Sequence, residues 1–184
     1  MAHERGKFTS RTKARKRAAE VLFEADQKGI ITSPGDLLGL LEERKYTTAA
    51  PSPLPPYAIR IIEGVAANQA AIDDLLARHA KGGGLDRIPA VDLAVLRVGV
   101  WELIANAEEV PPITAIDEAV AVVSQLSTDT SAAYVNAVLD ATRKGLEDPW
   151  AERSRVVIPE EESDPNAAPA PEETFEDDEF LDEY

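Results

Sequence analysis

The sequence predicts an all-α fold: a single compact bundle of about six or seven helices, followed by a disordered acidic C-terminal tail. In several segments apolar residues recur every three or four positions, which places them on one face of a helix. Glycine and proline separate these segments, and none alternates apolar and polar residues between hairpin turns as a strand would. The 184 residues, 44% of them hydrophobic, suffice for one domain with a substantial core.

The first predicted helix runs from Ser10 to Lys28 and begins in a strongly basic segment. Ser10 is expected to cap its N-terminus, and Gly29 is expected to end it. Phe23 falls almost opposite the apolar stripe, on one face with Lys16, so it is predicted either to face a partner or to pack under another helix. The apolar stripe consists of Ala14, Ala18, Val21, Leu22 and Ala25.

Proline and glycine delimit the next two predicted helices. Ser33 and Pro34 provide a cap and a first-turn residue for a short helix that runs to about residue 41. Residues 46–56 contain four prolines and are predicted to form an irregular connection. A longer helix is predicted over residues 57–80, and the three glycines at 82–84 stop it.

Residues 90–105 are so apolar that they are predicted to form the central helix of the bundle. Arg97 and Glu102 lie within this segment, where an unpaired charge would be costly. We therefore expect both to join a structural network with residues of other helices. The candidate partners are Asp92, Glu118 and Asn136.

Two further helices complete the predicted bundle. Thr114 with Asp117 is expected to cap a helix that runs to about Leu126. A polar loop over residues 127–131 then leads into the last helix. The buried side of that helix is predicted to consist of Val135, Val138, Leu139, Thr142 and Leu146.

The net charge of −15 is unevenly distributed along the chain. Residues 1–17 carry +6, and residues 159–184 carry −12 without a single basic residue. After Trp150 the sequence is dominated by Glu, Asp, Pro and Ala, and it cannot bury enough apolar surface to offset chain entropy. The predicted organisation is a flexible N-terminus (1–9), a helical domain (10–149) and a disordered acidic tail (150–184).

The residues on which enzymes most often rely are scarce. There is no cysteine, and the only histidines, His3 and His79, have no nucleophile or acid beside them in a catalytic pattern. The glycines at 82–84 lack the spacing and the lysine of a phosphate-binding loop. We therefore expect no enzymatic activity, no cofactor and no metal. The chain also shows no secretory signal or membrane span, so a cytoplasmic location is expected.

The basic segment favours nucleic-acid binding. Seven Lys and Arg residues stand against one acid within residues 1–17, and each one placed on a phosphate releases counterions. The alternative is a protein-interaction module whose basic helix docks on an acidic partner. The acidic tail either competes with RNA for the basic segment or simply solvates the protein.

Six short motifs occur along the chain in a fixed order: residues 11–15 (RTKAR), 21–23 (VLF), 85–88 (LDRI), 96–103 (LRVGVWEL), 115–120 (AIDEAV) and 134–139 (YVNAVL). Together they resemble the NusB family of bacterial transcription antitermination factors. The resemblance covers about residues 8–147, and it lies in the combination and order of the motifs rather than in any one of them.

The resemblance implies a helical, non-enzymatic protein that binds single-stranded RNA. NusB proteins bind the boxA element of ribosomal RNA leaders together with NusE, a small-subunit ribosomal protein. The complex acts on elongating RNA polymerase with other Nus factors. By position, Phe23 and Asp92 would contact NusE. The residues implied in RNA binding are Arg11, Lys13, Arg15, Lys16, Gln125, Tyr134 and Asn136.

Two positions depart from the family pattern. Asp117 stands where the family usually has asparagine, and its negative charge would weaken a direct RNA contact there. Ala137 stands where the family usually has glycine, and it adds a methyl group where close packing is expected.

Overall fold

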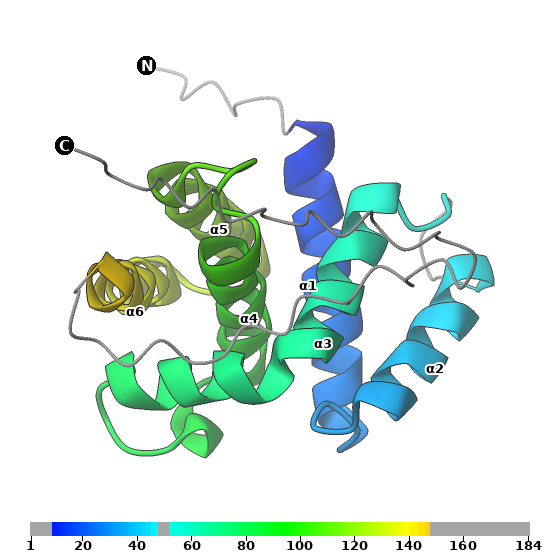
Figure 1. Ribbon diagram of the computed structural model, residues 1–184, viewed down its shortest axis with the longest axis horizontal. Coiled ribbons are helices and arrows are strands. Elements are labelled where there is room, and N and C mark those ends of the chain that lie inside the picture. The colour runs from blue at the N-terminus through cyan, green and yellow to red at the C-terminus, as the bar shows by residue number, and fades with distance from the viewer. Residues whose placement is uncertain (1–8, 48–51, 148–184) are drawn as a thin grey trace, which may run out of the picture.

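A computed structural model describes residues 9–47 and 52–147, which form a bundle of six α-helices and one 3₁₀ turn (Figure 1). No strand occurs among these residues, so the all-α prediction is confirmed. Of the predicted flexible N-terminus (1–9) only Thr9 is described, and the predicted acidic tail lies outside the described residues. The elements are α1 (Ser10–Gln27), α2 (Pro34–Tyr46), α3 (Pro56–His79), η1 (Leu85–Arg87), α4 (Ala90–Ala105), α5 (Pro112–Leu126) and α6 (Asp129–Glu147).

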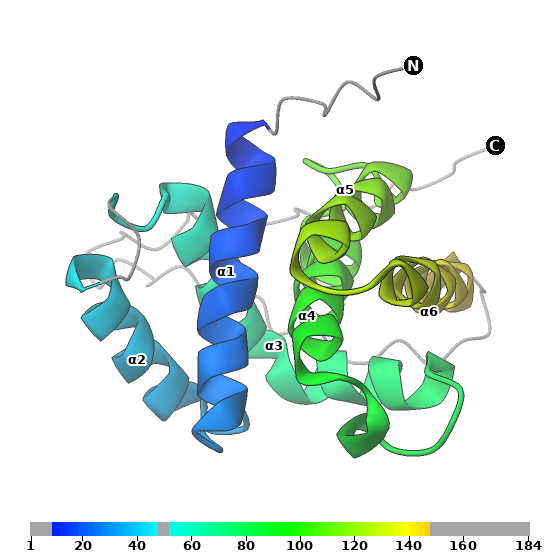
Figure 2. The same ribbon diagram turned by 180° about the vertical axis from the view of Figure 1, so that it is seen from behind.

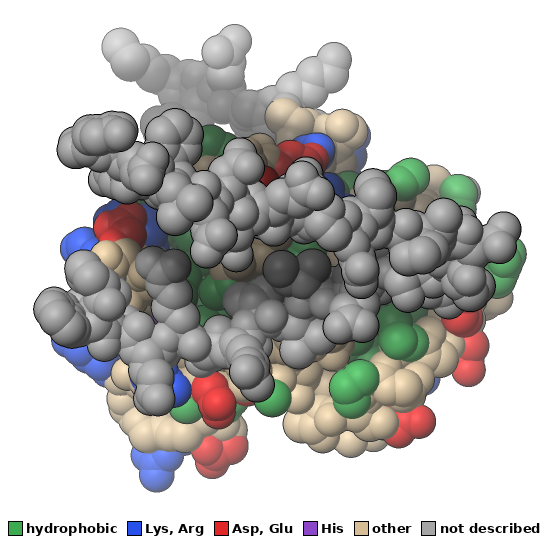
Figure 3. All heavy atoms as spheres, viewed as in Figure 1, with side chains coloured by type: hydrophobic (Ala, Val, Ile, Leu, Met, Phe, Trp, Pro, Cys, Tyr) green, Lys and Arg blue, Asp and Glu red, His purple; other side chains and the backbone are tan. Residues whose placement is uncertain are grey.

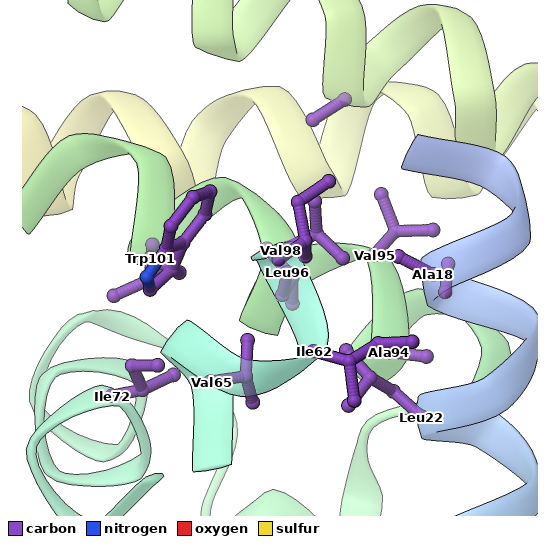
Figure 4. Packing of buried hydrophobic residues seen from close by; sticks show 14 of the residues in the cluster. Ala18, Leu22, Ile62, Val65, Ile72, Ala94, Val95, Leu96, Val98 and Trp101 are labelled. Atoms are coloured by element: carbon purple, nitrogen blue, oxygen red, sulfur yellow. The ribbon is translucent and has the colours of Figure 1, made fainter. Parts of the chain in front are cut away.

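Helix α4 is the central helix, as its apolar sequence predicts. It packs against α1, α3, α5 and α6, while α2 packs on α1 and α3 at one side of the bundle (Figure 1). Twelve of its sixteen residues are buried, so only its ends approach the surface. Figure 4 shows the core that forms around it: Ala18 and Leu22 of α1, Ile62, Val65 and Ile72 of α3, and Ala94, Val95, Leu96, Val98 and Trp101 of α4.

Two glycines allow helices to approach one another closely. A Cβ atom on Gly64 of α3 would lie 1.9 Å from Nε1 of Trp101, so the indole of α4 occupies the space that a side chain would need. A Cβ atom on Gly99 of α4 would lie 2.7 Å from Cδ1 of Leu139 on α6. Both positions therefore require the absence of a side chain for the observed packing.

Helix α3 bends at Asn68, where the sequence predicted one uninterrupted helix. The backbone of Asn68 leaves the helical region, with φ −119° and ψ 15°. Its side-chain amide donates to the carbonyl of Gly64, four residues earlier, at 2.9 Å, and so enters the helical hydrogen-bond ladder. The bend lets the first half of α3 run beside α1 and directs the second half toward α6 (Figure 1).

The helix starts differ from the predicted caps at three places. Thr9, not Ser10, caps α1, because its hydroxyl accepts the amide of Thr12 at 3.1 Å. Pro111 occupies the N-cap of α5, which places Thr114 and Asp117 inside the helix. Helix α6 begins at Asp129, two residues before the end of the predicted loop. No helix in the described ranges is both long enough and apolar enough to cross a membrane.

Candidate nucleic-acid interface

The solvent-facing side of α1 carries cations at one end and an aromatic ring at the other. Lys13, Lys16, Glu20 and Phe23 follow one another at spacings of three and four residues, which aligns them along one face of the helix. Lys13 and Glu20 are exposed, and Lys16 and Phe23 are half-buried. At about 1.5 Å per residue, roughly 15 Å separates Lys13 from Phe23. From behind, α1 is seen unobstructed along its length (Figure 2).

Arg11 also lies at the surface, on the flank of α1 that faces α3. Its side chain is 44% exposed and forms an ion pair with Glu109 in the α4–α5 loop. Its guanidinium carbon lies 4.5 Å from the centre of the Tyr57 ring, a distance typical of a cation–π contact. The cation is therefore held in place yet open to solvent.

Arg15 is buried, with 4% of its side chain exposed. Its Nε donates to the carboxylate of Glu102 at 2.9 Å and 3.1 Å, and its Nη1 pairs with Glu118 at 3.1 Å. This guanidinium is committed to two carboxylates of the bundle and presents no free face to solvent. Arg15 therefore has a structural role, and its guanidinium is not available for the direct RNA contact that the resemblance implied.

Phe23 borders an apolar hollow between α1, the start of α4 and the end of α5. The hollow has a volume of about 200 Å³. Phe23 itself is half-buried: it packs against the core and also lines the hollow. The lining residues are Ala19, Glu20, Phe23, Val91, Ala94 and Leu126.

Asp92 lines a second, larger hollow of about 410 Å³ on the other side of the α4 N-terminus. It is only 2% exposed, and its Oδ1 atom has no hydrogen-bond partner among the described residues. Tyr134 of α6 lines the same hollow, and burial together with the nearby Asp92 charge raises the pKa of its phenol. Because Val91 and Asp92 are consecutive, the two hollows lie on either side of the first turn of α4.

The remaining predicted RNA-binding residues are exposed. Gln125 precedes Leu126 at the end of α5, and Asn136 lies on α6 two residues after Tyr134. Neither lines the two hollows. Asp117 is exposed as well, so its charge faces solvent. Ala137 is also exposed, so its methyl group does not crowd a helix contact. The close packing expected there from the family pattern is not found.

Arg97 and Glu102 belong to structural networks, as expected. Of the predicted members, Glu118 shares Arg15 with Glu102, whereas Asp92 and Asn136 take part in neither network. Arg97 pairs with Asp73 at 2.9 Å and with Asp26 at 3.2 Å, which joins α4 to α3 and α1. Glu102 accepts hydrogen bonds from Arg15 and from the hydroxyl of Tyr57. Burial raises the pKa of Glu102, and Arg15 opposes that shift. Burial and Glu102 together raise the pKa of Tyr57 to about 12.

Sequence reasoning missed one surface cluster, formed by Arg60 of α3 with Asn106 and Glu109. Arg60 donates to Asn106 at 2.8 Å and forms an ion pair with Glu109, the carboxylate that also binds Arg11. Since Arg60 lies almost fifty residues from both partners, only the fold brings these groups together. In the sequence, the cluster was indicated only by the charged residues beside two proline pairs: Arg60 follows the pair at the start of α3, and Glu109 precedes the pair at the start of α5.

The bundle and the cationic, partly aromatic face of α1 define the general class of this molecule, an all-α binding protein. The model of the NusB family matches residues 12–144, which is most of the described chain. The chain therefore belongs to the NusB family.

Relatives and solved structures agree with this assignment. The transcription antitermination protein NusB of Beutenbergia cavernae is 50% identical over 135 residues, covering 72% of this chain and 88% of that protein. NusB of Saccharopolyspora erythraea is 49% identical over 130 residues, covering 71% and 84%. NusB of T. maritima has a similar structure, with a TM-score of 0.59 at 29% identity over 75% of this chain and 93% of that one.

A crystal structure of antitermination factors NusB and NusE in complex with dsRNA is similar as well. The TM-score is 0.56 at 27% identity, over 73% of this chain and 96% of the matched one.

Proposed function

We propose that this protein is an RNA-binding transcription antitermination factor that recognises boxA-type RNA of ribosomal RNA leaders together with NusE. The observation that carries the proposal is the outward face of α1, where Lys13 and Lys16 precede Phe23 on one stripe. Such a face offers phosphate contacts at one end and an apolar contact at the other. Membership of the NusB family and the similarity to a NusB–NusE structure with RNA support this reading.

On the RNA side, Arg11, Lys13 and Lys16 contact phosphates of single-stranded RNA. Each of these cations lies at least partly at the surface, which direct contact requires. Gln125, Tyr134 and Asn136 supply an amide, an aromatic ring and a second amide, groups that hydrogen-bond or stack on unpaired bases. Cations thereby provide affinity, and the polar and aromatic groups provide sequence preference.

On the protein side, NusE covers the hollow beside Phe23 and reaches Asp92 at the edge of the second hollow, by the first turn of α4. Its apolar residues fill the hollow beside Phe23, and a hydrogen-bond donor or cation reaches Asp92. Such a donor would satisfy the Oδ1 atom of Asp92, which has no partner in the described chain. The assembled complex then acts in the cytoplasm on elongating RNA polymerase, with other Nus factors, to oppose termination.

The direct test is binding of the full chain to a boxA RNA and to a scrambled RNA of equal length, with and without NusE. We expect tighter binding to boxA, with NusE increasing the preference. Contact with three phosphates predicts a slope of about −2 in a plot of log affinity against log salt. Equal affinities for the two RNAs in the presence of NusE would contradict the proposal.

A further inference from the structure

A second cationic cluster lies where the N-terminal end of α1 meets α3 and the α4–α5 loop. The side chains of Arg11 and Arg60 are 44% and 52% exposed. Arg11 binds one oxygen of the Glu109 carboxylate and Arg60 binds the other. Basic and acidic side chains adjoin one another near this end of α1 in Figure 3. The two arginines thus converge on a single surface carboxylate.

Besides Glu109, each of the two guanidinium groups contacts an uncharged side chain of the bundle. Arg60 donates to the buried Asn106 side chain at 2.8 Å, and Asn106 in turn donates to the hydroxyl of Tyr57 at 3.2 Å. Arg11 lies over the ring of the same tyrosine, 4.5 Å from its centre. The arginines therefore stay in place when Glu109 is displaced, which lowers the entropic cost of binding another anion.

The Glu109 carboxylate resembles a phosphodiester in two respects. Each carries one negative charge, and each offers two equivalent oxygens that paired guanidinium groups bind well. The cluster of two cations and one anion also keeps a net charge of +1, so it still attracts an anionic chain.

We propose that Arg60 and Arg11 form an RNA-phosphate site in which Glu109 occupies the phosphate position until RNA displaces it. This inference rests on the RNA-binding function proposed above, and it extends the RNA surface from α1 onto α3. Glu109 then acts as an internal competitor that weakens binding to phosphates in general. An RNA with a boxA sequence displaces Glu109 more readily than other RNAs do, because it gains additional base contacts when it binds.

The test is RNA binding by R60Q and E109Q at several salt concentrations, with boxA RNA and NusE present. R60Q should lower affinity about three- to tenfold at low salt and reduce the magnitude of the log–log salt slope by about 0.7, the value for one lost single-strand phosphate contact. E109Q should raise affinity about two- to fivefold, because a surface ion pair no longer competes with RNA. The gain should be smaller in the double variant R60Q/E109Q.

Two matched variants separate the site from general charge effects. R78Q removes an exposed arginine at the other end of α3, and E108Q removes the exposed acid next to Glu109. Circular dichroism and thermal unfolding establish that every variant is folded. The inference would be overturned if R60Q bound RNA with the same affinity as R78Q, or if E109Q bound RNA with the same affinity as E108Q. If K13Q/K16Q still lowers RNA affinity in that case, the proposed function stands without the Arg60–Arg11 site. If the wild-type chain does not prefer boxA RNA, both the proposed function and this inference are wrong.

Discussion

At the scale of single residues, Arg15 shows how a surface-like sequence pattern conceals a core residue. It sits in a basic run with Lys13 and Lys16. The helical period places it next to the apolar stripe, but it places the exposed Arg11 there as well, so the local sequence does not show which of the two arginines is buried. Its partners Glu102 and Glu118 lie 87 and 103 residues away, so only the folded chain reveals the network. Burial without these carboxylates would be prohibitive for a guanidinium.

The buried position of Arg15 makes a stability prediction. R15A leaves the Glu102 carboxylate buried without its cation, which should lower the free energy of unfolding by about 3–5 kcal/mol. K16A, one residue further along, should change it by less than about 0.5 kcal/mol. Urea denaturation monitored by circular dichroism measures both. An R15A protein as stable as wild type but deficient in RNA binding would restore Arg15 as a direct RNA contact.

At the scale of elements, helical periodicity and helix breakers predicted where the helices lie, but not how their ends are capped or bent. The spacing of apolar residues located the outer helices, because each must bury one face, and the almost continuous apolar composition of residues 90–105 located α4. The cap at Thr9 and the bend at Asn68 depend on side-chain hydrogen bonds that several nearby residues could have made. The close approach of α3 and α4 at Gly64 likewise depends on a partner 37 residues away.

Substitution by alanine should have opposite effects on stability at a tightly packed helical glycine and at an open one. G64A places a methyl group on the Trp101 indole and should destabilise the protein by about 1–3 kcal/mol. G39A on α2 meets no atom within 4 Å and should stabilise it by about 0.5–1 kcal/mol, because alanine loses less backbone entropy in a helix. Thermal unfolding of both variants against wild type tests the prediction. A G64A protein as stable as G39A would refute the close α3–α4 packing.

The contact between α1 and α2 should depend on pH. Hydrogen bonds from Arg44, aided by Lys28, lower the pKa of Glu24 from 4.5 to about 2. A depressed carboxylate pKa contributes stability above about pH 4.5, and that contribution disappears as the pH falls toward 2. The difference in unfolding free energy between wild type and E24Q should therefore shrink across this range.

Urea titrations at pH 7, 5 and 3 measure that difference. E63Q, which removes an exposed carboxylate of α3, controls for the general loss of charge. A difference between wild type and E24Q that stays constant over these pH values would show that the Arg44 pairing does not stabilise the fold.

At the scale of the whole molecule, the sequence predicted the fold class, the central helix and the basic segment because each depends on local composition. It did not predict the two hollows or the Arg60 cluster, since these arise where α1, α3, α4, α5 and α6 meet. The helical angle alone placed Phe23 almost opposite the apolar stripe of α1, but the hollow that Phe23 lines could be found only from the fold. Long-range assembly therefore determines the site even though local pattern determines the helices.

The central claim is that the two ends of the outward face of α1 bind different partners. Parallel titrations of boxA RNA and of NusE with K13Q/K16Q and F23A test it most directly. K13Q/K16Q should lower RNA affinity about tenfold or more and reduce the magnitude of the salt slope by about 1.4, while NusE affinity stays within about twofold. F23A should weaken NusE about tenfold and leave RNA binding alone unchanged. Loss of NusE with retained RNA affinity in K13Q/K16Q would contradict the account and favour a protein-docking basic helix.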